Sequence, residues 1–325
     1  MGSPLAMASS AQAAATASAF TSLAPYRLLD TRYGVGAAKV AVAKGGTVHL
    51  QVATRGGVPA TGVSAVVLNV TVTAPTKPGY VTVYGDGTTR PTASNLNFVA
   101  GQTIPNLVIA PVGANGKVAL YNGTGGTIHL IADVSGYYRS RARTATGAFG
   151  ALAPYRLLDT RYGLGAPKVA VAAGGMVALQ VTDRGGVPSA GVSAVVLNVT
   201  ATAPTRAGSV TVFGTGSIRP AANDVNFVAD QSVPNLVTAA VGTGGKVSLY
   251  NGSAGTVHLI ADVSGYYVSG NPSVVGVFGS LPQPPLLDTR TGGARPSAQL
   301  PGTPRWGCRS PAAGVSRPRV SPRWC

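Results

Sequence analysis

The sequence predicts an all-β fold, a tandem of antiparallel β-sandwiches with two complete copies. Three observations predict it: the composition, a hydrophobic period of two, and an internal repeat. Gly (44) and Pro (24) make up about a fifth of the 325 residues, and Glu is absent. Long helices favour Glu, Lys, Leu and Ala, so this composition argues against a helical protein. A hydrophobic content of 45% supplies a packed core and argues against global disorder.

The internal repeat sets the domain organisation. Three segments recur with a constant offset of 129 residues: 24–34 as 153–163, 62–71 as 191–200, and 129–138 as 258–267. This period exceeds the 20–50 residues of a solenoid unit, so each copy is expected to be a whole domain. A third copy begins with Leu-Leu-Asp-Thr-Arg at 286–290 and then loses the pattern.

The repeat boundaries and the composition divide the chain into seven parts. The polar segments between copies are expected to be linkers, the first of them rich in Arg. We expect a residual signal peptide or disordered leader at 1–19, repeat 1 at 20–138, a basic linker at 139–147, repeat 2 at 148–268, a linker at 269–276, the start of a truncated repeat 3 at 277–293, and a tail at 294–325.

Within one copy, apolar and polar residues alternate, as in residues 47–54, 68–73 and 80–84. A period of two gives a strand one apolar and one polar face. Residues 66–68 and 107–109 are continuous apolar runs, so we expect them to be buried on both sides. Gly-rich turns separate eight or nine short strands per copy, and Asn115–Gly116 is expected to close a hairpin. Jelly-roll and immunoglobulin-like orders both remain open.

Residues 1–19 are small and apolar, and Ala11-Gln-Ala13 fits the small-x-small pattern of a signal-peptidase site. A basic segment and a full apolar segment are missing before it. One hypothesis is that the true start lies upstream, so that Met1 is an internal residue of a signal peptide. The alternative is a disordered Ala-rich leader.

The tail from about residue 294 differs in composition from the repeats. It contains six Arg, no acidic residue, both Trp (306 and 324) and both Cys (308 and 325). Reverse translation of residues 314–325, shifted by two bases, encodes a segment that closely matches residues 57–67. We therefore interpret the tail as repeat 3 translated out of frame, and expect it to be disordered. Its cysteines then predict no disulfide, and its arginines no nucleic-acid partner.

The candidate ligand-binding residues surround a recurring Asp-Thr-Arg motif. Asp and Arg two residues apart share one strand face and can pair bidentately. One interpretation is a structural ion pair that ties the first strand to its domain. The other is a polar anchor in a ligand groove, with tyrosines as stacking surfaces. The candidates are Tyr26, Asp30, Arg32 and Tyr33 in repeat 1, and Tyr155, Asp159, Arg161 and Tyr162 in repeat 2.

The other polar residues give no clear indication of a catalytic or metal-binding site. His49 is replaced by Ala178 in repeat 2, and His129 and His258 are lone strand histidines, which are usually structural. Asn69, Asn97 and Asn106 either satisfy loop backbone or suit sugar hydroxyls. The sequence contains no metal-ligand motif, nucleophile elbow or phosphate-binding loop. We therefore expect no catalytic residues, no metal and no cofactor.

The charge is strongly positive despite few charged residues. The formal net charge is +16, and residues 1–280 contain 18 Lys and Arg against 8 Asp. Basic secreted domains often meet anionic partners such as wall polymers, although a merely soluble basic surface explains the charge equally well. The sequence has no apolar run long enough for a transmembrane helix. The oligomeric state is not readable.

Three motifs, Leu-Leu-Asp-Thr-Arg, Val-Leu-Asn-Val-Thr and Asp-Val-Ser-Gly-Tyr-Tyr, occur in the same order in both copies. Over about residues 20–293 the chain resembles an extracellular tandem repeat of high-GC Gram-positive bacteria. That resemblance implies an extracellular or cell-surface location and a modular protein, often beside secreted catalytic modules. The repeat has no established activity, so no catalytic residues are carried over.

We therefore expect a secreted, non-catalytic repeat protein for cell-surface attachment or for binding glycan or cell-wall polymer. A structural spacer without a ligand is the first alternative. The second is the accessory region of a secreted hydrolase whose catalytic module is missing.

Overall fold

A computed structural model describes residues 19–140, 146–270 and 277–278. Over these residues the chain forms sixteen β-strands and one 3₁₀ turn, Thr243–Gly245 (η1), with no α-helix. The predicted all-β fold is confirmed. The leader, most of the basic linker and the Cys- and Trp-containing tail lie outside the described residues, and so do the predictions made for them.

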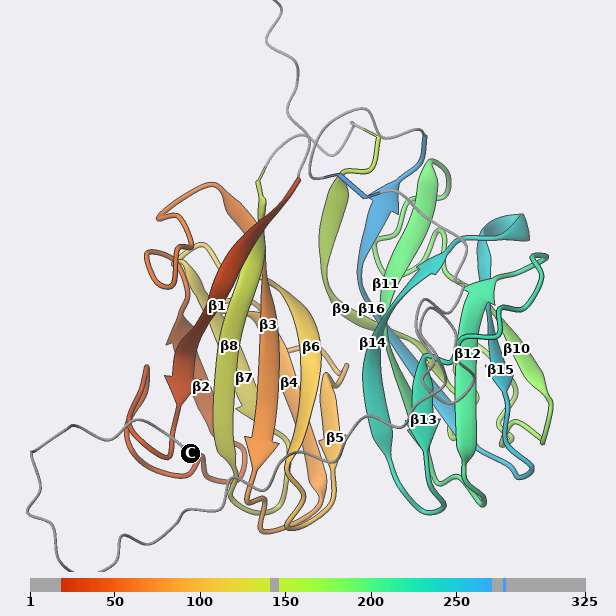
Figure 1. Ribbon diagram of the computed structural model, residues 1–325, viewed down its shortest axis with the longest axis horizontal. Coiled ribbons are helices and arrows are strands. Elements are labelled where there is room, and N and C mark those ends of the chain that lie inside the picture. The colour runs from red at the N-terminus through yellow and green to blue at the C-terminus, as the bar shows by residue number, and fades with distance from the viewer. Residues whose placement is uncertain (1–18, 141–145, 271–276, 279–325) are drawn as a thin grey trace, which may run out of the picture. The chain divides into compact units, whose positions relative to one another are not determined.

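Eight strands form each copy, here called module 1 (β1–β8) and module 2 (β9–β16) (Figure 1). Module 1 contains β1 (Phe20–Asp30), β2 (Thr47–Gln51), β3 (Val63–Thr73), β4 (Gly79–Gly85), β5 (Leu96–Phe98), β6 (Ile104–Pro111), β7 (Lys117–Asn122) and β8 (His129–Arg139). Module 2 contains β9 (Phe149–Asp159), β10 (Met176–Gln180), β11 (Val192–Thr202), β12 (Gly208–Gly214), β13 (Val225–Phe227), β14 (Val233–Ala240), β15 (Lys246–Asn251) and β16 (His258–Val268).

The strand order in each module is that of a jelly roll. Module 1 has one sheet in the order β1-β8-β3-β6 and another in the order β2-β7-β4-β5, and module 2 repeats both orders. Every neighbouring pair is antiparallel. Two four-stranded sheets in this order are two Greek keys folded together, whereas an immunoglobulin-like domain divides its strands four to three. The structure therefore decides between the two topologies that the sequence left open.

The core of each module lies between its two sheets. Along β3, Val66, Leu68, Val70 and Val72 are fully buried and belong to one apolar cluster. They are alternate residues, so the period of two in the sequence places them on the same inner face. Tyr137, near the end of β8, is buried against the same cluster.

The predicted hairpin at Asn115–Gly116 is wrong. A tight turn does form there: Gly116 has a φ of +74°, and its N–H donates to the carbonyl of Gly113 at 2.9 Å. However, β6 before the turn pairs with β3, while β7 after it pairs with β2 and β4. The turn thus connects two different sheets. Turn chemistry determines where the chain reverses, but not which strands then pair.

The prediction that residues 66–68 and 107–109 are buried on both sides is confirmed except at Leu107. Val67 and Ile109 point away from the core of module 1, yet are buried, because they pack against module 2. Leu107, on the same strand as Ile109, remains 43% exposed. The outer face of this sheet is therefore only partly covered.

Both modules belong to one compact unit and pack directly on each other. Their shared cluster contains Tyr138 of module 1 and Phe149 and Tyr267 of module 2. The Tyr138 ring lies 4.2 Å from that of Phe149, and the Tyr138 and Tyr267 hydroxyls are 2.7 Å apart. Phe278, which follows Phe149 by the repeat offset, stacks on Tyr267 at 4.1 Å. The same aromatic contact is thus used twice along the chain.

Candidate functional site

The Asp-Thr-Arg motif of module 1 forms a tight ionic cluster at the end of β1. Asp30 is buried, and its carboxylate accepts hydrogen bonds from Arg32 Nε at 2.9 Å and Arg32 Nη2 at 2.7 Å. It also accepts the Arg32 backbone N–H at 3.0 Å and Arg27 Nη1 at 3.0 Å. The bidentate pair expected from the spacing is present. Because both oxygens of Asp30 are engaged, this carboxylate serves to hold arginines.

Arg27 adds a second carboxylate to the cluster. Its guanidinium also bonds Asp133 on β8, with Nη2 3.2 Å from Oδ2, and so joins β1 to β8. Sequence reasoning did not single out Arg27, although it belongs to the repeated segment around Asp30. Thr31 Oγ1 lies 2.9 Å from Nδ1 of His129, which gives that lone histidine a structural partner.

The electrostatics keep both motif carboxylates ionised. Hydrogen bonds from Arg32 are the largest influence on Asp30 and hold the pKa of its carboxyl below the usual value. Burial opposes ionisation of Asp159, but the hydrogen bonds and charge of Arg161 outweigh it, and the pKa is again lowered. A carboxylate with a lowered pKa that is saturated by arginines is a poor proton donor. The geometry suits carboxylates that hold the guanidinium groups of Arg32 and Arg161 in place.

The predicted tyrosines lie in two different places. Tyr33 is 60% exposed, and the Arg32 guanidinium lies 5.1 Å from its ring centroid. Tyr26 instead rests on the loop at Gly56, where a Cβ would lie 2.8 Å from Cδ1 of the ring. Adjacent residues of a strand point to opposite faces, so Tyr26 and Arg27 diverge. Asp30, Arg32 and Tyr33 are therefore brought together, and no described contact joins Tyr26 to them.

Module 2 repeats the same geometry. Arg161 Nε and Nη2 lie 2.9 and 2.7 Å from the oxygens of Asp159, and its guanidinium lies 5.1 Å from the centroid of the exposed Tyr162. Tyr155 rests on Gly185 as Tyr26 rests on Gly56. The arrangement around the Asp-Thr-Arg motif thus occurs twice with nearly identical distances.

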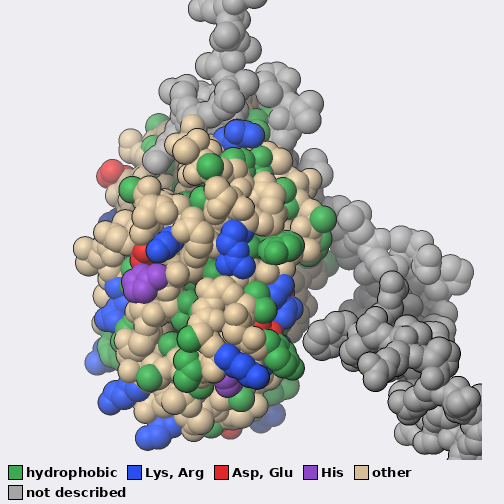
Figure 2. All heavy atoms as spheres, turned by 90° about the vertical axis from the view of Figure 1, so that its left-hand side faces the viewer, with side chains coloured by type: hydrophobic (Ala, Val, Ile, Leu, Met, Phe, Trp, Pro, Cys, Tyr) green, Lys and Arg blue, Asp and Glu red, His purple; other side chains and the backbone are tan. Residues whose placement is uncertain are grey.

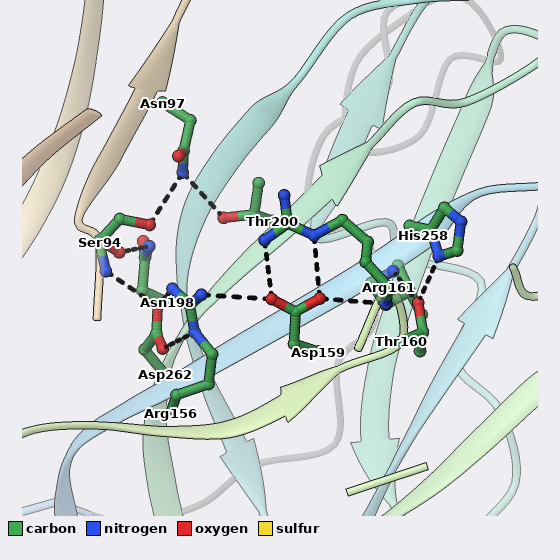
Figure 3. A network of polar contacts seen from close by, with 11 residues as sticks. Ser94, Asn97, Arg156, Asp159, Thr160, Arg161, Asn198, Thr200, His258 and Asp262 are labelled. Atoms are coloured by element: carbon green, nitrogen blue, oxygen red, sulfur yellow. Dashed lines mark hydrogen bonds and ion pairs between the residues drawn. The ribbon is translucent and has the colours of Figure 1, made fainter. Parts of the chain in front are cut away.

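The two clusters differ in what covers their second carboxylate. In module 2, Arg156 Nε lies 2.7 Å from Oδ1 of Asp262, and the backbone N–H of Ser94 in module 1 donates to Asp262 at 3.2 Å (Figure 3). Burial raises the pKa of Asp262, opposed by the hydrogen bonds of Arg156. The corresponding Asp133 of module 1 is half-buried, and among the described residues none of the other module donates to it.

A second Arg–Tyr pair lies beside the other sheet of each module. Arg90 lies 3.8 Å above the ring of Tyr121 on β7, and Arg219 lies 3.9 Å above that of Tyr250 on β15. Sequence reasoning missed these pairs because their members are about thirty residues apart. The one available signal was that both members recur with the repeat offset.

On the face of the molecule drawn in Figure 2, basic side chains are spaced apart and form no single patch. Figure 2 shows Lys and Arg outnumbering Asp on the face of module 1 that lies on the left in Figure 1, spaced among polar and apolar side chains. Within the described ranges, no three His, Cys, Asp or Glu side chains are grouped to hold a metal ion. No helix in this part of the chain has the length and apolarity to cross a membrane.

Comparisons with known proteins add little. No family model matches the chain, and no curated protein matches it. Among solved structures, the crystal structure of the STIV MCP is 8% identical with a TM-score of 0.32, covering 77% of this chain and 96% of its own. The tandem CBM22-1–CBM22-2 domain of Paenibacillus barcinonensis Xyn10C is 13% identical with a TM-score of 0.21, covering 76% and 99%. Both likenesses are too distant to support an argument about function.

Proposed function

We propose that the protein binds an acidic polysaccharide of the cell surface through the exposed Arg–Tyr pairs, without catalysis. The proposal rests on one observation: the pairs Arg32–Tyr33 and Arg161–Tyr162 have the same geometry in both modules. In each pair a buried aspartate holds the arginine. In this proposal the protein acts outside the cell, in line with the resemblance of its repeats.

The chemistry of the pair suits a sugar that carries a carboxylate or phosphate. An exposed tyrosine ring offers an apolar face for a sugar ring, with a polar hydroxyl at its edge. The adjacent guanidinium provides charged N–H donors for the acidic group. Arg32 uses Nε and Nη2 on Asp30, and its side chain remains 37% exposed. Because Asp30 already fixes the guanidinium, binding loses little further side-chain entropy.

The overall charge supports the same class of partner. Residues 1–280 carry 18 Lys and Arg against 8 Asp, so this part of the chain favours an anionic polymer over a neutral one. Two equivalent sites on one chain also suit a polymer with repeating units, because a second contact strengthens the first through a high effective concentration.

The test is a calorimetric titration of the full chain with polygalacturonate as the acidic probe and dextran as the neutral control. We expect binding to polygalacturonate alone, and a loss of about tenfold or more in affinity for the Tyr33→Ala/Tyr162→Ala double variant. Val40→Ala/Val169→Ala is the matched control, because both valines are exposed at equivalent positions. Equal affinities for the two double variants would contradict the assignment of the site.

A structural spacer is the second candidate, favoured by the direct packing of the two modules around Tyr138 and Phe149. The same titration separates the two functions. A failure to bind polygalacturonate and also purified wall polymer would leave the spacer as the better account.

A further inference from the structure

Beside the apolar cluster that both modules share, the contact between them contains a polar part made by two different surfaces. Module 1 contributes what we call its edge surface: the loop before β5 with strands β5 and β6. Module 2 contributes what we call its sheet surface: the outer face of β11, β14 and β16. The edge-surface residues are Ser94, Asn97 and Asn106, and the sheet-surface residues are Asn198, Thr200, Leu236 and Asp262.

Buried hydrogen bonds connect these surfaces (Figure 3). The Asn106 side-chain amide donates to Asn198 Oδ1 at 2.7 Å, and the Asn198 amide donates to the carbonyl of Ser94 at 2.6 Å. The Asn97 amide reaches Thr200 Oγ1 at 3.3 Å, and the backbone N–H of Ser94 reaches Asp262. Polar groups buried in this way are costly to separate from their partners. The polar part of the contact is therefore specific.

The residues that make these polar contacts have counterparts a second time on the same chain, with no described contact to the other module. Those of module 1 lie beside Val67 and Ile109, which module 2 already covers. The edge surface of module 2 has Asn223, Asn226 and Asn235, all exposed. The sheet surface of module 1 has Asn69 and Leu107, both exposed, and Thr71 and Asp133, both half-buried. Their counterparts across the contact are buried, apart from the half-buried Asn97 and Leu236.

The second edge surface keeps the chemistry of the first. The Asn235 amide donates to the carbonyl of Asp224 at 2.7 Å, as the Asn106 amide donates to that of Asn95 at 2.6 Å. Asn235 is thus already oriented like its counterpart. Asn223 replaces Ser94, but Ser94 acts across the contact through its backbone N–H and carbonyl, which any residue supplies.

A contact between two unlike surfaces leaves one surface of each kind free on the pair, so it extends from copy to copy when both surfaces are repeated. We propose that copies of this chain associate head to tail, the edge surface of module 2 of one copy docking on the sheet surface of module 1 of the next. Asn235 then meets Asn69, Asn226 meets Thr71, and the backbone at Asn223 meets Asp133. This proposal does not depend on the Arg–Tyr pairs.

The association is weaker than the contact within one chain, for two reasons. Within the chain the linker holds the surfaces together at an effective concentration on the order of millimolar, and separate copies lack that advantage. In addition, Phe278 already stacks on Tyr267, so the aromatic part of the contact is occupied. Docking between copies therefore rests on the polar bonds and on Leu107.

Sedimentation velocity on the full chain in reducing buffer, from about 10 µM to about 1 mM, tests the proposal. We expect the sedimentation coefficient to rise with concentration. Leu107→Arg disables the sheet surface and Asn235→Lys disables the edge surface, so neither variant self-associates. Both positions are exposed, and neither change disturbs the core. Met176→Arg, at an exposed site on β10, which belongs to neither surface, is the control and is expected to associate like the wild type.

Mixing the two disabled variants gives the decisive result. Each has one intact surface, and these are complementary, so the mixture is expected to form a one-to-one dimer that stops growing. Three results would overturn the proposal: no association of the wild type at the highest concentration, association that either variant leaves unchanged, or no dimer in the mixture. The third would indicate a symmetric contact, or one made by residues outside the described part.

Discussion

At the scale of single residues, Asp30 and Asp159 decide where two arginines point in each module. Each buried carboxylate accepts two side-chain bonds from Arg32 or Arg161 and one from Arg27 or Arg156. Removing one partner of a buried ion pair leaves the other charge without compensation.

Replacement of Asp159 by asparagine tests this role. Arg156 and Arg161 would lose their shared carboxylate, so the free energy of unfolding at pH 7 is expected to fall by about 3 kcal/mol. Urea denaturation measures the change. Asp230→Asn is the matched control, because Asp230 is exposed and asparagine tolerates its φ of 60°. Similar stabilities of the two variants would show that the cluster at Asp159 is dispensable.

The pH dependence of stability follows from the same carboxylates. The pKa values of Asp30 and Asp159 are lowered by folding, so their contribution is complete above the unfolded value of about 3.9 and is lost as pH falls through the folded values. The pKa of Asp262 is raised, so its contribution is lost as pH rises from the unfolded towards the folded value.

We therefore expect wild-type stability to fall steeply as the pH drops below about 4, and Asp159→Asn to show a shallower fall. Denaturation curves between about pH 2 and pH 6 measure both slopes. Parallel slopes for the two proteins would contradict the assignment of a lowered pKa to Asp159.

At the scale of elements, the strands could be predicted but their pairing could not. Alternation along β3 places Val66, Leu68 and Val70 on one face, and the sequence shows this directly. Pairing in a jelly roll joins distant segments, such as β1 with β8, and depends on the packing of both sheets. The Asn115–Gly116 turn was therefore placed correctly in the chain, but was expected to join paired strands.

The candidate site divides in the same way. The bidentate bond of Arg32 to Asp30 follows from a spacing of two residues, so it was predictable. The bond of Arg27 to Asp133 depends on the register of β1 against β8. The bond from Ser94 to Asp262 depends on how module 1 packs on module 2, which a period of 129 does not reveal.

Aromatic rings also pack directly over glycines of the strands, where a larger side chain would not fit. At Gly265 on β16, a Cβ would clash with the Phe149 ring, which lies over the strand. Gly265→Ala is expected to lower the free energy of unfolding by about 1–3 kcal/mol, because the ring and its neighbours must shift. Gly125→Ala is the control, since its Cβ would meet only Lys77 at an ordinary 3.6 Å. Equal thermal unfolding temperatures would contradict the close packing of Phe149.

At the scale of the whole molecule, two copies of one sequence have unequal surroundings. Asn198 is 2% exposed while Asn69, its counterpart, is exposed, because module 1 covers only the sheet surface of module 2. The reverse holds for Asn106, which is buried, and Asn235, which is exposed. The sequence alone assigns these pairs the same role, and only the packing separates them.

This inequality predicts different effects of one substitution at matched positions. Asn106→Ala is expected to destabilise the chain by about 1–3 kcal/mol, because it leaves the side-chain oxygen Oδ1 of Asn198 buried without its donor. Asn235→Ala is expected to change stability by less than about 0.5 kcal/mol, as surface substitutions usually do. Urea denaturation at low protein concentration compares them, and equal losses would contradict the packing of the modules.

Two equivalent Arg–Tyr pairs on one chain are the centre of the functional proposal, and their combined action is directly measurable. The measurement compares the affinity of the full chain for a short galacturonate oligomer and for long polygalacturonate. We predict that the long polymer binds more tightly by about tenfold or more, and that Tyr162→Ala removes this advantage while leaving oligomer binding at Tyr33. Equal affinities for the two lengths, or an advantage that survives in Tyr162→Ala, would contradict binding through both modules.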